Sequence, residues 1–146
     1  DMQGSKALYL EAWARARGQA FLRFDYSGHG QSSGDFEAGA IGDWAGDALA
    51  VIAAQTEGPL LLVGSSMGGW ISLLIARTLP ERICGLVGIA AAPDFTTRTW
   101  EQDLTDAQRD VVVRTVVRAA AGRVHRRVRG RARDPDRVHA QLPRPR

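Results

Sequence analysis

Residues 59–70 read PLLLVGSSMGGW, an apolar run followed at once by two serines between glycines. Within this stretch, Gly64-Ser65-Ser66-Met67-Gly68 has the pattern G-x-S-x-G, which between a strand and a helix raises its central serine on a sharp turn. The apolar run before it predicts a short buried strand, and residues 70–76 after it predict an apolar helix. The stretch therefore predicts that Ser66 is a catalytic nucleophile.

The glycines around Ser66 have a predicted steric role. A serine on so sharp a turn takes up a strained backbone, and side chains two residues to either side would collide with the neighbouring strand and helix. Gly64 and Gly68 remove those side chains, and Gly69 is a further small residue where the helix packs close to the sheet. The ordinary alternative is a Gly-Ser turn without catalytic role, but the strand before it and the helix after it favour the catalytic interpretation.

The composition limits the class of protein. With 146 residues, the chain forms at most one domain and falls short of the roughly 200–250 residues that complete α/β domains often need. Its single cysteine, Cys84, lies in an apolar run, which predicts a buried inert thiol in a reducing compartment. No stretch reaches the length of a membrane span, and the first residues lack the order of a signal peptide. We therefore expect a cytoplasmic protein.

The net charge of +3 conceals two segments of opposite charge. Residues 1–108 carry 7 basic and 13 acidic side chains, whereas residues 109–146 carry 12 arginines and 3 acidic side chains. The second segment has no aromatic side chain for stacking on bases, so we expect no nucleic-acid partner. Its narrow composition is typical of a GC-rich gene read out of frame, with a solvated appendage or a selected nucleic-acid tail as alternatives. We expect residues 1–108 to form the core, and residues 111–146 to be loose or helical without packing.

Helices and strands are predicted to alternate along residues 1–91. Such alternation, with strands that are nearly continuous apolar runs, favours an α/β fold with three layers, in which helices cover both faces of a parallel sheet. Right-handed crossovers then place Ser66 at the carboxyl edge of the sheet. The first predicted elements are a helix capped by Ser5 and ended near Gly18, a strand over residues 20–24, and a helix with Trp44, Ala48, Val51, Ile52 and Gln55 on one face. The strand and helix around Ser66 follow, and then a strand over residues 83–91. A last helix is predicted to start at the T-x-x-Q of residues 105–108 and to run into residues 111–117, for which a strand is an equal alternative.

Residues 1–108 resemble the α/β-hydrolase superfamily in two motifs that occur in the family's order. Asp25-Tyr26-Ser27-Gly28-His29-Gly30-Gln31-Ser32 is similar to a loop that precedes the nucleophile strand, and residues 64–70 are similar to the nucleophile turn itself. Together with the opening residues 1–7, the two motifs resemble most the branch of palmitoyl-protein thioesterases that also cleave acyl glucuronides, and its bacterial relatives. The resemblance implies a serine hydrolase that acts on a small-molecule acyl ester or thioester through an acyl-enzyme, with neither cofactor nor metal.

The chain departs from this family at both ends. After Asp106 nothing resembles the family's lid, its later strands, or the loops that carry the triad acid and base, and the chain begins after the loop that supplies one oxyanion donor. The other donor is expected to be the backbone N–H of Met67. We therefore expect an incomplete hydrolase core that is inactive as this fragment. The alternative is a noncatalytic product, either truncated or frameshifted, or a small basic-tailed binding protein.

Three histidines are candidate bases, and none is assigned as the base of a Ser, Asp, His triad. His29 lies in the DYSGHG loop, where relatives use the histidine for loop structure. His125 is surrounded by arginines without a nearby acid, and His139 follows residues 134–136 too closely for an intervening strand and helix. The triad acid and base therefore stay unidentified in the sequence.

Overall fold

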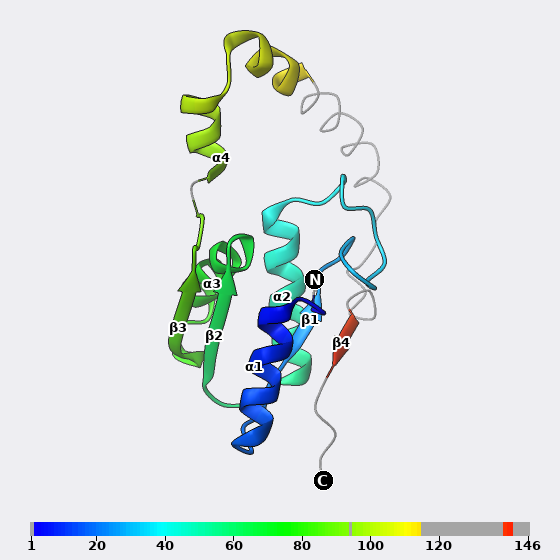
Figure 1. Cartoon of the computed structure of the whole chain (residues 1–146), viewed down its shortest axis with the longest axis vertical. Coiled ribbons are helices and arrows are strands. Elements are labelled where there is room, and N and C mark those ends of the chain that lie inside the picture. Colours follow the sequence, from blue (N-terminus) through cyan, green and yellow to red (C-terminus); the bar gives the residue numbers. More distant parts are fainter. Residues whose placement is uncertain (1, 94, 115–138, 142–146) are drawn as a thin grey trace.

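The structure is a computed structural model, and it describes residues 2–93, 95–114 and 139–141. Its elements alternate as predicted from the first helix to the strand that follows Ser66's helix (Figure 1). They are α1 (Ser5–Ala16), β1 (Arg23–Asp25), α2 (Ile41–Gln55), β2 (Leu60–Ser65), α3 (Met67–Thr78), a 3₁₀ turn η1 (Pro80–Arg82), β3 (Ile83–Ile89), α4 (Phe95–Arg98), a π-helical turn η2 (Thr99–Asp103), helical residues 106–114, and β4 (His139–Gln141).

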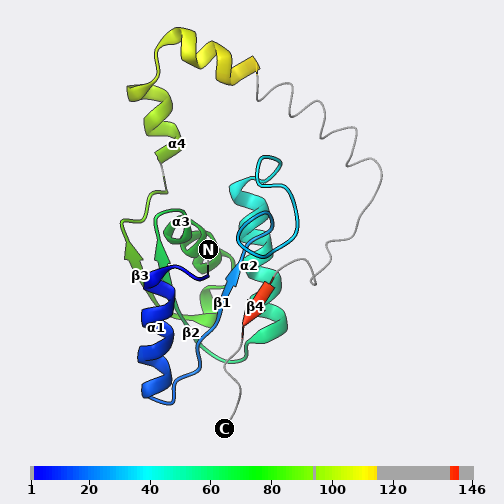
Figure 2. The same ribbon diagram turned by 45° about the vertical axis from the view of Figure 1, so that its right-hand side comes forward.

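Strands β2 and β3 form the parallel pair that carries the candidate site. They lie side by side in both views, joined by the crossover helix α3 (Figures 1 and 2). Leu60 pairs with Ile83 and Leu61 with Gly85, so Cys84 has no partner on β2 and forms a bulge. Cys84 is exposed, and the prediction of a buried thiol is therefore wrong.

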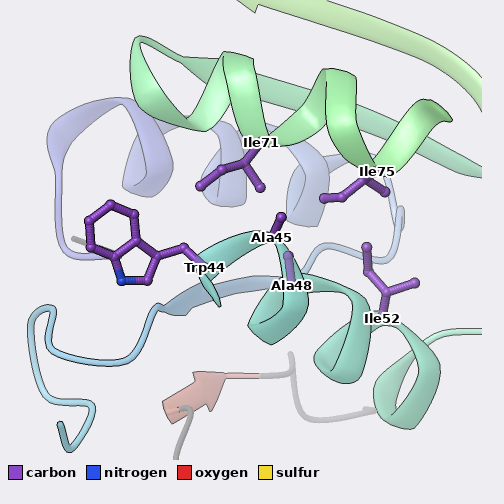
Figure 3. Close-up of a cluster of buried hydrophobic side chains, with 6 residues drawn as sticks. All are labelled: Trp44, Ala45, Ala48, Ile52, Ile71 and Ile75. Atoms are coloured by element: carbon purple, nitrogen blue, oxygen red, sulfur yellow. The ribbon is translucent and has the colours of Figure 1, made fainter. Parts of the chain in front are cut away.

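The hydrophobic core lies between α2 and α3. Figure 3 shows side chains of α2 pointing toward Ile71 and Ile75 of α3. Burial of a side chain such as Ile71, which is 1% exposed, contributes about 1.5–3 kcal/mol. The predicted buried face of the second helix is confirmed except at Gln55, which is exposed. The buried cluster consists of Trp44, Ala45, Ala48, Ile52, Ile71 and Ile75, with Phe24, Leu60 and Leu62 among the side chains packed against it.

The two faces of the β2–β3 pair differ in burial. Leu60 and Leu62 pack on the α2–α3 core, whereas Leu61 and Val63, which point to the opposite face, are 53% and 40% exposed. Val87 and Ile89 of β3 are exposed as well. The predicted α/β class is confirmed as a partial fold, in which these side chains of the parallel pair are exposed among the described residues.

Strand β1 pairs with β4 rather than with β2. The pairing is antiparallel and sets Asp25 opposite His139. The sequence did not predict this contact for the segment after residue 108, because β4 has only three residues. Most of the segment that was expected to be loose lies outside the described residues, so the division at residue 108 stays a prediction.

The two predicted helix starts have different outcomes. Gly4 occupies the cap position of α1 and Ser5 lies inside the helix, so the prediction that Ser5 caps it is wrong. Gly18 follows the end of α1 with a φ of 65°, as expected for a glycine after a helix. At residues 105–108 the capping box is confirmed, since the Thr105 N–H donates to Gln108 Oε1 at 2.9 Å and the Gln108 N–H donates to Thr105 Oγ1 at 3.4 Å.

Residues 95–114 stand apart from the sheet. Both views show α4 and the helical residues 106–114 extending away from the other elements (Figures 1 and 2). Val111 at the far end of this segment is 63% exposed. None of the helices in the described part of the chain is both long and apolar enough to cross a bilayer.

Candidate active site

Ser66 lies at the junction of β2 and α3. Its backbone has φ 52° and ψ −120°, a conformation that costs a residue with a side chain on the order of 1–3 kcal/mol. The Ser66 N–H donates to the Ile89 carbonyl at 3.0 Å, which ties the turn to the end of β3. The predicted strained turn at the carboxyl end of the strand is confirmed.

Glycines allow the backbone to close around this turn. A Cβ on Gly64 would collide with the carbonyl of Gly68, as predicted for Gly64. A Cβ on Gly69 would come within 2.5 Å of the Ala91 Cβ, which confirms that α3 packs closely at this point. The steric role predicted for glycine at position 68 is not seen, because a Cβ there would have no close contact among the described residues outside its own helix turn. It is the backbone carbonyl of Gly68 that approaches Gly64.

The first turn of α3 presents free N–H groups beside Ser66. The Ser66 carbonyl accepts hydrogen bonds from Gly69 N–H at 2.9 Å and from Trp70 N–H at 3.2 Å. The N–H groups of Met67 and Gly68 come before these and so have no acceptor within the helix. A helix N-terminus favours negative charge. The Met67 N–H is therefore suited to an oxyanion formed at Ser66, although its role stays a prediction.

A pocket of about 220 Å³ adjoins Ser66. It exceeds the roughly 150 Å³ of a cavity that holds benzene, so it has room for a group the size of an aromatic ring. The pocket lies between the carboxyl ends of β1 and β2. Its lining residues are Phe24, Asp25, Tyr26, His29, Ser65, Ser66, Met67 and Gly68.

The loop over residues 26–34 forms one wall of this pocket and folds around Asp25. The Asp25 carboxylate is buried and accepts hydrogen bonds from Met2 N–H at 2.5 Å and from Gln31 N–H at 3.1 Å. The Ser32 hydroxyl donates to the Asp25 carbonyl at 2.6 Å. Sequence reasoning missed Asp25 as a pocket residue. The feature of the sequence that could have indicated Asp25 is the pair of glycines that follows it, Gly28 and Gly30. Both have a positive φ in the structure, as the tight loop around Asp25 requires.

His29 packs in an aromatic cluster within the same loop. Its ring contacts Phe36 and Trp44 edge-on, with centroids 5.1 and 4.9 Å away. Its Nδ1 lies 3.2 Å from the Ser27 carbonyl. Because a carbonyl only accepts, a hydrogen bond at this contact needs a proton on Nδ1. These contacts agree with the predicted loop-structural role, yet His29 also lines the Ser66 pocket.

No general base is assigned within the described residues. None of the hydrogen bonds among them involves the Ser66 hydroxyl, and His125 and residues 134–136 lie outside the described ranges. In the same part of the chain, no group of three or more His, Cys, Asp or Glu side chains is placed to hold a metal ion. The structure therefore brings together Ser66, a pocket and a helix N-terminus.

The tyrosine of the pocket wall is held in its neutral form. Burial, with the Asp47 charge as a second cause, raises the pKa of Tyr26 to about 12. Asp47 also accepts a hydrogen bond from the Ser27 N–H at 3.0 Å. The Tyr26 hydroxyl therefore keeps its proton further into the alkaline range than an exposed tyrosine does.

Comparisons with known proteins point to one family. The hydrolase family described as serine aminopeptidase, S33, matches residues 7–142. The mitochondrial palmitoyl-protein thioesterase ABHD10 of Bos taurus is 38% identical over 116 residues, which cover 80% of this chain and 38% of that protein. The Homo sapiens protein of the same name is 39% identical over 115 residues, with 79% and 38% covered. The chain thus spans well under half the length of these relatives.

Two solved structures share the fold. The alpha/beta hydrolase domain-containing protein 10 from mouse superposes with a TM-score of 0.73 at 37% identity, covering 79% of this chain and 46% of that chain. A hydrolase from Agrobacterium vitis S4 gives a TM-score of 0.73 at 44% identity, covering 77% of this chain and 46% of that chain. At these identities the likeness includes sequence as well as fold.

Proposed function

Because this chain belongs to the serine aminopeptidase S33 family of α/β hydrolases, we propose that Ser66 is the nucleophile of an ester or thioester hydrolase. The observation that carries the proposal is the backbone of Ser66, a serine with φ 52° between a parallel strand and a helix. Glycine would adopt this conformation without strain, so a serine there costs stability. Strain of this kind is found where a side chain is held for function.

The proposed reaction uses an acyl-enzyme. The Ser66 Oγ attacks the acyl carbonyl carbon, a base takes the hydroxyl proton, and the Met67 N–H stabilises the oxyanion. The alcohol or thiol then leaves with a proton, and water releases the acid and restores Ser66. In the family the triad acid and base follow the nucleophile in sequence, and no residue of this chain is matched to either.

A small acyl ester or thioester is the proposed substrate. Support for a thioester comes from the named activity of the mitochondrial relatives, which are palmitoyl-protein thioesterases. The pocket beside Ser66 has aromatic walls from Phe24 and Tyr26, which suit an apolar group of the substrate.

We expect the chain by itself to turn over ester substrates very slowly. Without a general base the serine hydroxyl stays protonated and is a weak nucleophile. Loss of triad members lowers the rate by factors of roughly 10⁴ to 10⁶. Hydrolysis of p-nitrophenyl butyrate measures this directly. Turnover within tenfold of a complete relative, abolished by Ser66→Ala, would mean that a histidine of this chain is the base.

A chimera tests the role of Ser66 in a complete enzyme. Residues 1–108 replace the matching segment of the Agrobacterium vitis hydrolase, whose remaining chain supplies the rest of the fold. We expect the folded chimera to hydrolyse p-nitrophenyl butyrate, Ser66→Ala to lower kcat at least 10⁴-fold, and Ser5→Ala, at an exposed position of α1 outside the pocket lining, to keep most of the activity. An active chimera that is unaffected by Ser66→Ala would refute the proposal.

A noncatalytic product is the second candidate, and the arginine-rich segment after residue 108 favours it. The nucleotide sequence downstream of the Gln108 codon separates the two. Another reading frame that encodes a strand, an acid loop and a histidine would indicate a frame error in a hydrolase gene.

A nucleic-acid partner is not proposed, because the segment after residue 108 has no aromatic side chains. The proposed cytoplasmic location rests on the residues alone, whereas the animal relatives are mitochondrial by name.

A further inference from the structure

Asp25 is a buried carboxylate whose two oxygens bind two different segments. Only 1% of the residue is exposed. Its Oδ1 accepts the N–H of Met2, which lies 23 residues away in sequence, and its Oδ2 accepts the N–H of Gln31, six residues away. Arg23 strengthens the first contact, because its guanidinium donates to the Met2 carbonyl at 2.6 Å. The carboxylate therefore joins the N-terminal segment to the loop over residues 26–34.

The chemistry of these contacts requires a carboxylate. Each oxygen faces a backbone N–H, and an ionised carboxyl group only accepts. An asparagine would offer one oxygen and one NH₂, so one backbone N–H would face another donor. Gly30 makes room for the arrangement, because a Cβ at that position would collide with Asp25 Oδ2.

The segments that Asp25 joins border the Ser66 pocket. Asp25 lines the pocket together with Tyr26, His29 and Ser66. Its own carbonyl accepts the Ser32 hydroxyl, so two consecutive residues of the loop, Gln31 and Ser32, bind Asp25. These contacts connect Asp25 to the loop that forms one wall of the Ser66 pocket, a loop that Asp47 and Trp44 also hold through Ser27.

We propose that Asp25 is a positioning residue: by binding Met2 and Gln31 it holds the loop so that Tyr26 and His29 form the pocket wall beside Ser66. An effect of Asp25 on catalysis rests on the proposed function of Ser66. The effect of Asp25 on the position of the loop does not. Asp25 itself does not react. Its effect is transmitted through the loop to the shape of the pocket.

Asp25→Asn in the full chain tests this, with Asp35→Asn as the matched control. Asp35 directly follows this loop, is exposed, and its carboxylate accepts only the Glu37 N–H among the hydrogen bonds described. Amide hydrogen exchange and chemical shifts are measured by NMR. We expect Asp25→Asn to speed exchange at Met2 or Gln31 about tenfold or more and to leave α2 and α3 within twofold. The control should change neither.

A spectroscopic readout separates positioning from general stabilisation. The ¹⁵N shifts of the His29 ring report the tautomer with its proton on Nδ1, which the Ser27 carbonyl selects. Asp25→Asn should disturb these shifts and the Ser66 amide shift, and Asp35→Asn should not. Exchange that rises equally throughout α2 and α3, or an unchanged loop, overturns the proposal.

A measurement on the unaltered chain covers the case in which Asp25→Asn does not fold. If one carboxylate holds both segments, the Met2 and Gln31 amides exchange through a common opening with the same denaturant dependence. Independent openings would overturn the proposal. None of these readouts requires Ser66 to react, so failure of Ser66 as a nucleophile and failure of Asp25 as a positioning residue are distinguishable.

Discussion

Two turns meet at the Ser66 pocket, and they are held by different means. The turn at Ser66 is shaped by backbone contacts, because Gly64 lies against the Gly68 carbonyl and the Ser66 N–H reaches the end of β3. The loop over residues 26–34 is shaped by side chains, with the Asp25 carboxylate at its centre and an aromatic cluster around His29.

The difference determines how each turn responds to change. A turn set by close backbone approach fails when one atom is added at a crowded glycine, and it tolerates additions elsewhere. A loop set by side-chain hydrogen bonds depends on partners that are distant in sequence and on their charge state. Four predictions, in order of decreasing effect, test this contrast.

Gly64→Ala should have the largest effect on stability. The added Cβ has no room beside the Gly68 carbonyl, and backbone on both sides has to move. We expect the free energy of unfolding to fall by about 3 kcal/mol or more. Urea denaturation followed by circular dichroism measures it. A loss below about 1 kcal/mol would mean that this turn is less tightly packed than its backbone geometry indicates.

Alkaline pH should lower the free energy of unfolding through Tyr26 in the loop over residues 26–34. Burial and Asp47 raise the pKa of Tyr26 from 10.0 to about 12, so the folded state disfavours the tyrosinate. The stabilising difference is fully present below pH 10 and is lost as the pH rises toward 12, by up to about 2 kcal/mol. Unfolding free energies at pH 9 and pH 12 measure it. Tyr26→Phe should remove this part of the pH dependence, and an unchanged profile in that variant would contradict the assignment.

Ser66→Gly should stabilise the protein. Glycine adopts the φ of 52° without the cost of a Cβ, so we expect a gain of about 1 kcal/mol in the free energy of unfolding. Ser66→Ala keeps the Cβ and serves as the control, with little gain. Guanidinium denaturation midpoints compare the two variants. Equal midpoints would show that the strain at Ser66 is negligible.

Gly68→Ala should have the smallest effect, although Gly68 belongs to the same motif as Gly64. Its Cβ would meet nothing within 4 Å, and it lies in the first turn of α3. We expect a change of no more than about 0.5–1 kcal/mol, toward greater stability, because alanine favours helix. Thermal unfolding monitored at 222 nm provides the value. A clear destabilisation would mean that the added Cβ at position 68 collides with a neighbouring group, contrary to the backbone geometry.

The sequence by itself determined the turn at Ser66, the buried face of α2 and the parallel alternation around β2 and β3. These features follow from local rules. The spacing of Gly64 and Ser66 reflects backbone sterics between residues 64 and 69, and the apolar periodicity of α2 reflects 3.6 residues per turn. Such rules act between near neighbours in the chain and can therefore be read from it.

Only the tertiary structure decided which residues complete the site. Asp25 became the centre of the pocket wall through Met2, Cys84 became exposed through a bulge against β2, and β1 found its partner in β4. Each outcome depends on contacts between residues far apart in sequence, whose register no local pattern specifies. The turn at Ser66 is thus encoded locally, whereas the pocket beside it is a product of the packed fold.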